Sequence, residues 1–142
     1  MLAYRHLFHA GNFADVFKHA LLTRLLLALQ RKDKPFCYLD THAGIGRYDL
    51  THPWAEKLAE HRDGIDRILG REVPAVLKPY VECVQAENRK GDLRFYPGSP
   101  RIARRFLREG DRMELTELNR DDCSALARLF QARAYCAMQY RS

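Results

Sequence analysis

The stretch over residues 36–46 constrains the fold most, because an apolar run ends in Asp40 and then breaks into a loop containing Gly44 and Gly46. The apolar run predicts a strand with a hydrogen-bond acceptor at its carboxyl end. The two glycines permit positive φ and let the backbone approach a ligand closely. Open α/β sheets bind nucleotides at the carboxyl ends of their strands, so the stretch indicates a nucleotide-binding turn.

The spacing within this turn narrows the kind of nucleotide. A dinucleotide-binding loop has a third glycine and leads directly into a helix, but here that position is Asp49 and Pro53 follows shortly after. The pattern Asp-x-x-x-Gly-x-Gly is instead typical of the loop with which class I methyltransferases hold S-adenosylmethionine. A purely structural turn after a buried strand is the alternative interpretation.

Composition and charge narrow the class of protein. The 142 residues, 46% of them hydrophobic, suffice for one core of ordinary size, and no apolar run approaches the ~20 residues of a membrane span. The sequence has no secretory signal, and its four cysteines show neither CxxC nor zinc-ligand spacing. We therefore expect a soluble single domain in the reducing cytoplasm, without a metal and without membrane contact.

The formal net charge is +6, and the basic residues concentrate in two segments, residues 18–34 and 101–112. This distribution predicts binding to a polyanion. The alternative interpretation is a solvated basic face.

Local signals place the first elements along the chain. Asn12 resembles an N-cap, and apolar residues at helical spacing predict a helix over residues 12–30, followed at once by the strand over residues 36–40. Residues 51–90 contain two helical stretches, and we interpret them as an insertion that follows the glycine loop.

The remaining elements follow a polar break. A short extended segment covers residues 93–96, and a helix is predicted with Ser99 as N-cap and Gly110 as its stop. Residues 113–116 read as a second strand of the sheet, and Asn119 or Asp121 caps a last helix that runs to about residue 130.

Glu117 follows the second strand, about 20 residues after the preceding helix begins, which is where such sheets carry the acid that binds ribose hydroxyls. This spacing holds once residues 51–90 are set aside as an insertion. Asp40 and Glu117 thus end two consecutive strands, which favours a cofactor site. A charge at the rim of the sheet is the alternative reading of Glu117.

Four runs carry a family resemblance: YRHLFHAGNFADVFKH at residues 4–19, YLDTHAGIGRY at 38–48, YPGSP at 96–100 and LTEL at 115–118. The chain resembles the RlmJ family, bacterial enzymes that methylate adenine N6 in 23S ribosomal RNA, from Met1 to about Phe130. The resemblance implies an α/β, Rossmann-like class I S-adenosylmethionine-dependent methyltransferase fold. We expect residues 1–142 to form its amino-terminal part, an incomplete domain with an inserted helical subdomain.

The resemblance also implies roles for individual residues. Seven residues are implied to bind S-adenosylmethionine: His19, Asp40, His42, Gly44, Gly46, Ser99 and Glu117. Three are implied to bind the RNA substrate, where an aromatic ring can stack on a displaced adenine and a cation can meet phosphate: Tyr4, His6 and Lys18. Judged without the family, His19 reads as an ordinary histidine on a helix face.

One departure from the family pattern bears on catalysis. The sequence contains no Asp-Pro-Pro-Tyr tetrapeptide, whose acceptors take the hydrogen bond of the adenine amino group, and it ends about half way through the family's length. We expect a truncated or frame-disrupted product that lacks activity alone and self-associates through uncovered sheet and helix faces. Two alternatives stay open: a non-catalytic RNA-binding domain with a relic glycine loop, and, less favoured, a different nucleotide-binding enzyme.

Overall fold

The computed structural model describes residues 5–89 and 91–131 of the chain. Strands β1 (Cys37–Asp40) and β4 (Arg112–Leu115) pair in parallel, with Cys37 opposite Arg112 and Asp40 opposite Leu115. The carboxyl ends of both strands therefore lie at the same edge. These strands confirm the two that were predicted at residues 36–40 and 113–116, within one residue at each end, and an α/β chain with parallel strands.

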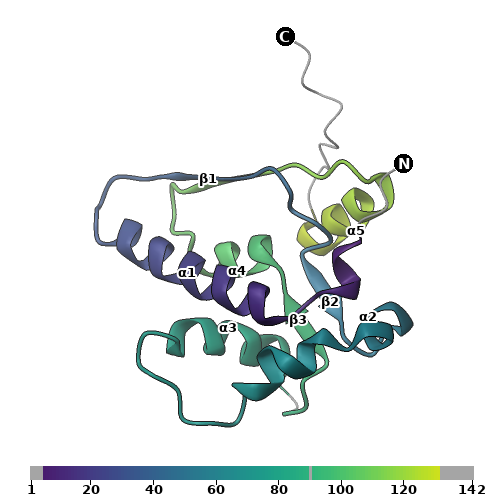
Figure 1. Ribbon diagram of the computed structural model, residues 1–142. Helices are drawn as coiled ribbons and strands as arrows, with labels where there is room; N and C mark the ends of the chain where they lie inside the picture. Colours follow the sequence, from purple (N-terminus) through teal and green to yellow (C-terminus); the bar gives the residue numbers. More distant parts are fainter. Residues whose placement is uncertain (1–4, 90, 132–142) are drawn as a thin grey trace.

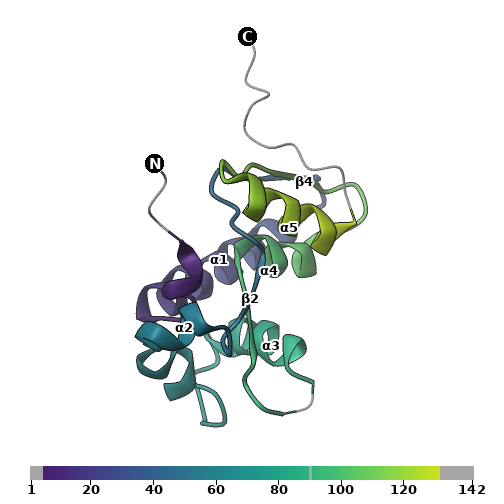
Figure 2. The same ribbon diagram turned by 90° about the vertical axis from the view of Figure 1, so that its right-hand side faces the viewer.

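Helix α1 (Phe13–Gln30) forms the centre of the molecule. Figures 1 and 2 show β1 and β4 on one side of α1 and α4 (Ser99–Phe106), and α3 (Lys78–Glu87) on the opposite side. The side chain of Asn12 accepts a hydrogen bond from the backbone N–H of Asp15, which confirms the predicted N-cap and start of the helix.

A second, antiparallel pair joins β2 (Arg47–Asp49) to β3 (Phe95–Pro97). Tyr48 stands opposite Tyr96, and both side chains are buried. The sequence analysis predicted the extended segment around β3 but gave no strand at β2. The largest side chains of the core gather beside this pair: Tyr80, Tyr96, Leu50, Ile65 and Ile102.

Residues 51–89 contain α2 (Pro53–Leu58), two short 3-10 turns η2 (Glu60–Asp63) and η3 (Ile65–Arg67), and α3. The first helical stretch is thus divided. Ala59 adopts a left-handed conformation with φ of 49° and ends α2. Gly64 then lies so close to α1 that an added Cβ would stand 2.1 Å from the carbonyl oxygen of Gly11. Close approach to the start of α1 therefore breaks the helical run here.

Two predictions about α4 are wrong. Gly98, not Ser99, is its N-cap, because the Ser99 hydroxyl is used elsewhere and donates to the carboxylate of Asp40 over 2.6 Å. The helix ends at Phe106 rather than at Gly110. The reason is Arg108, whose side chain pairs with Asp111 at 3.0 Å and donates to the backbone carbonyls of Gln30 and Lys32 at the end of α1, so the chain leaves the helix early.

The last described helix, α5 (Arg120–Phe130), begins after Asn119, whose side chain accepts from the backbone of Asp121 and Asp122. This confirms Asn119 as the cap. The short turn η1 (His6–Phe8) is tied to α5, since Arg5 donates to Asp122 over 2.7 Å. No helix in the described part of the chain is long and apolar enough to cross a membrane.

One face of α1 carries large apolar side chains that are 45–75% exposed, at every fourth position: Phe13, Phe17, Leu21, Leu25 and Leu29. Leu39 on β1 is also 55% exposed. Solvent therefore reaches an apolar stripe along the whole helix and part of the β1–β4 pair.

Candidate functional site

A cavity of about 650 Å³ opens where β1 and β4 end. Its volume is in the range of small-molecule and cofactor sites. Seven of the residues singled out in the sequence line it together: His6, Lys18, His19, His42, Gly44, Ser99 and Glu117. Asp40 and Gly46 are described but are not among its lining residues, and Tyr4 lies outside the described residues.

Asp40 does not line the cavity itself but hydrogen-bonds to residues that do. One carboxylate oxygen accepts from the hydroxyls of Tyr38 and Ser99 over 2.8 and 2.6 Å, and the other accepts from the backbone N–H of His42 over 3.0 Å. Burial and the neighbouring carboxylate raise the pKa of Tyr38, so its hydroxyl remains a donor. Asp40 therefore fixes two wall residues, Ser99 and His42, in place.

Close packing of neighbouring side chains requires glycine at positions 44 and 46 of the loop. Gly44 has φ of 61°, and an added Cβ would stand 2.2 Å from the hydroxyl oxygen of Tyr48. Gly46 has φ of 76°, and a Cβ there would meet Leu129 of α5 at 2.8 Å. Both positions combine left-handed backbone with close packing, which only glycine accommodates without strain.

Glu117, which follows β4, hydrogen-bonds to the glycine loop that follows β1. Its two carboxylate oxygens accept from the backbone N–H groups of Gly44 and Asn119, each over 2.8 Å. A carboxylate has about four lone-pair positions, so this side chain retains capacity for hydroxyl donors of a ligand. The bond to Gly44 joins the two strand ends that the sequence analysis paired.

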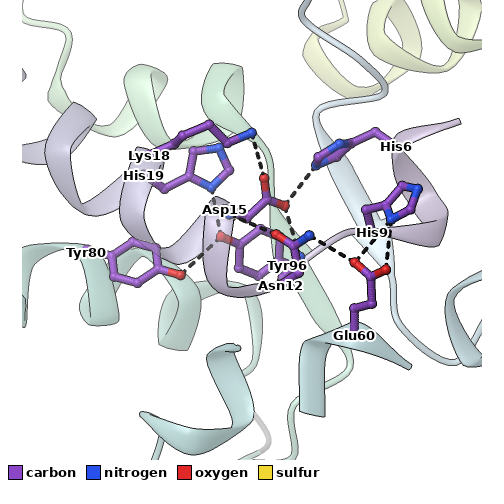
Figure 3. A network of polar contacts seen from close by, with 10 residues as sticks. His6, His9, Asn12, Asp15, Lys18, His19, Glu60, Tyr80 and Tyr96 are labelled. Carbon is purple, nitrogen blue, oxygen red and sulfur yellow. Dashed lines mark hydrogen bonds and ion pairs between the residues drawn. The ribbon is translucent and has the colours of Figure 1, made fainter. Parts of the chain in front are cut away.

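His19 lies on the cavity wall at 6% exposure. Its Nδ1 is 2.8 Å from the hydroxyl of Tyr96, which in turn lies 3.0 Å from the hydroxyl of Tyr80 (Figure 3). Burial lowers the pKa of His19 to about 4, so the imidazole is neutral at physiological pH. A neutral ring offers one donor and one acceptor, and the contact with Tyr96 orients it.

Asp15 is a cavity residue that the sequence analysis did not single out, since it read only as part of the cap of α1. It is fully buried, and its carboxylate lies within 3.0 Å of both His6 and Lys18 (Figure 3). Its spacing of three residues from Lys18 was the available signal, because such neighbours share a helix face.

Positive charge at the cavity comes from Arg5 and Lys18. The arginines of residues 101–112 do not line the cavity. Arg101 is held by Glu87 at 2.7 Å and Arg108 by Asp111, so two of those five arginines serve the fold. The described residues contain no group of three or more histidine, cysteine or acidic side chains placed to hold a metal ion.

Two curated proteins are similar to the chain in sequence. The ribosomal RNA large subunit methyltransferases J of Escherichia coli (strain K12) and Haemophilus influenzae are 52% and 46% identical to the chain over 132 residues. Those residues make up 92% of this chain but 47% of each relative, so the chain spans about half the length of the curated relatives it matches.

A crystal structure of protein LPL1258 from Legionella pneumophila superposes with a TM-score of 0.76 at 40% identity, over 90% of this chain and 48% of that one. The fold and the cavity define an α/β protein with a cavity at the carboxyl ends of two parallel strands. The family model described as ribosomal RNA large subunit methyltransferase D, RlmJ, matches residues 33–141. The chain belongs to the RlmJ family.

Proposed function

We propose that this chain provides the cofactor site and part of the RNA site of an S-adenosylmethionine-dependent methyltransferase that modifies adenine N6 in 23S ribosomal RNA. Its described part corresponds to the amino-terminal part of a Rossmann-like class I domain, with residues 51–90 inserted after the glycine loop. The observation that carries the proposal is that residues of both predicted sets line one cavity: His19, His42, Gly44, Ser99 and Glu117 of the cofactor set, and His6 and Lys18 of the RNA set.

The cavity fits the cofactor in volume and in donor set. Glu117 would accept from the ribose hydroxyls, while His19, His42 and Ser99 would supply polar contacts and the loop through Gly44 and Gly46 would bound the methionine end. When bound, S-adenosylmethionine supplies an electrophilic methyl group. The Gly44 bond to Glu117 supports this assignment, because it couples loop and carboxylate into one wall.

The target adenine would enter on the side of His6 and Lys18. Lys18 is 59% exposed and available to RNA phosphate, and His6 packs edge-on against Tyr48 with ring centroids 5.2 Å apart. Tyr4, outside the described residues, is proposed to stack on the adenine.

Methyl transfer needs an acceptor for the adenine amino proton. These 142 residues contain no Asp-Pro-Pro-Tyr segment to supply it. We therefore propose that they bind cofactor and RNA without turnover. Radiolabelled methyl transfer to unmodified 23S RNA tests this: an extended chain with that segment should be active, and turnover by the 142 residues alone would contradict the proposal.

A non-catalytic RNA-binding domain is the second candidate. It is favoured by the protein donors that each carboxylate oxygen of Asp40 and Glu117 already has, because such bonds hold the loop in place without a cofactor. Cofactor binding separates the two candidates.

Calorimetry with S-adenosylmethionine provides that test. Glu117→Ala should weaken binding roughly 10- to 100-fold, since a charged hydrogen bond contributes ~1.5–3 kcal/mol. Glu114→Ala, an exposed carboxylate on β4 that does not line the cavity, is the matched control and should bind like the parent. Equal affinity in Glu117→Ala would show that the ribose assignment is wrong, and no heat in the parent would favour the RNA-binding candidate.

A further inference from the structure

Asp15 is a fully buried carboxylate in the wall of the cavity. Its Oδ2 accepts from Nε2 of His6 over 2.8 Å and from the backbone N–H of Gly11 over 3.0 Å. Its Oδ1 is a buried atom with no hydrogen-bond partner among the described residues, but it lies 3.0 Å from the Nζ of Lys18. Figure 3 shows Asp15 between Lys18 and His6.

The charge state of this group follows from its partners. Burial raises the pKa of Asp15, but the hydrogen bond and charge of His6, together with the contributions of His19 and of the Gly11 backbone N–H, outweigh it and hold the pKa well below its usual range. Asp15 is therefore an anion at neutral pH. A buried anion is costly unless it is paired; here Oδ2 accepts two hydrogen bonds and Oδ1 forms an ion pair with Lys18.

A capping role explains only half of this arrangement. Asn12 and Asp15 exchange contacts with the backbone as in a capping box, through the Asp15 N–H and the Gly11 N–H. That role uses Oδ2 alone. Oδ1 instead faces an ammonium group one helical turn further on, whose side chain is 59% exposed. Two fixed contacts at Oδ2 thus hold Oδ1 in a constant position against Lys18.

We propose that Asp15 is a positioning residue whose Oδ1 aims the Lys18 ammonium at the mouth of the cavity, where it meets an RNA phosphate beside the target base. The inference rests on the proposed function, which places RNA on this side. Lysine carries a flexible four-carbon stem, so a fixed counter-charge determines where its ammonium lies.

The test is the salt dependence of RNA binding by the 142-residue chain. Each phosphate contact contributes about 0.7 to 0.9 to the slope of log K against log salt concentration. Asp15→Asn retains an acceptor for Gly11 but presents no charge to Lys18. For a hairpin with a bulged adenine, the slope of Asp15→Asn should be smaller than that of the parent by the amount of about one phosphate contact, about 0.7 to 0.9. The slope of Lys18→Met should be smaller by the same amount.

The double variant Asp15→Asn, Lys18→Met decides whether the two residues act together. Its slope and affinity should match those of Lys18→Met alone, because coupled residues are not additive. It also remains informative if Asp15→Asn alone fails to fold, since removing both charges leaves none unpaired. A further loss in the double variant, or a parental slope in folded Asp15→Asn, would overturn the proposal.

Glu60→Gln is the matched control. Glu60 bonds His9 at 3.0 Å and Asn12 at 2.9 Å, so it also ties η1 to α1, but it does not line the cavity. Its slope should equal that of the parent, and the same drop in Glu60→Gln would reduce Asp15 to a structural role. Calorimetry with S-adenosylmethionine is run beside each variant: absent heat in the parent contradicts the methyltransferase proposal, whereas the slopes still decide the role of Asp15.

Discussion

Neutral, buried His19 makes folding stability depend on pH in a defined window. The pKa of His19 is lowered by burial from an ordinary 6.5 to about 4. Between these values the unfolded chain binds a proton that the folded chain excludes, so stability is complete above pH 6.5 and falls as the pH falls towards 4. The difference between the two pKa values corresponds to a total loss of about 3 kcal/mol in the free energy of unfolding, of which about 2 kcal/mol is lost by pH 5.

Urea unfolding at pH 7.5 and pH 5.0 measures this effect. Between pH 7.5 and pH 5.0, the free energy of unfolding of the parent should fall by about 2 kcal/mol more than that of His19→Gln. The glutamine does not titrate and still offers an acceptor to the Tyr96 hydroxyl. At pH 5 Asp15 is ionised in both states and does not contribute. His42→Gln, at an exposed position, is the control and should lose as much as the parent. Equal losses in the parent and His19→Gln would refute the assignment of a buried neutral imidazole.

Four further outcomes are expected. RNA affinity, measured by fluorescence anisotropy, should decline as the salt concentration rises, and an affinity independent of salt would contradict the proposed phosphate contacts. In the same assay, Tyr4→Ala should weaken binding to a hairpin with a bulged adenine more than binding to a plain duplex. Gly44→Ala should lower the melting temperature more than Gly70→Ala, because both have positive φ but only Gly44 meets Tyr48. Phe17→Glu, at a position that is 72% exposed, should shift the chain towards monomer in analytical ultracentrifugation, and unchanged association would exclude the α1 stripe as the contact.

The elements that local signals define were predictable. Asn12 and Asn119 each carry their own capping oxygen, so the starts of α1 and α5 follow from a few neighbouring residues. The strand β2 was not predictable in this way. It is three residues long, and it is a strand only because β3, almost fifty positions later, pairs with it.

The site shows the same division between local and distant contacts. Asp40 and Glu117 were found because each follows an apolar run. Ser99 was wrongly predicted as the N-cap of α4, since the sequence cannot show that its hydroxyl donates to Asp40 over 2.6 Å. The cavity position of Asp15 was missed because its contact with His6 depends on the turn η1, which brings His6 back against α1.

Amide NMR titration with S-adenosylmethionine tests most directly whether the cavity is the cofactor site. The resonances of Gly44, Ser99 and Asn119 should shift in a saturable manner, because they line the cavity or contact its wall. The exposed turn at Gly70 should not respond. Saturable shifts confined to residues away from the ends of β1 and β4, or none at millimolar cofactor, would contradict the proposed site.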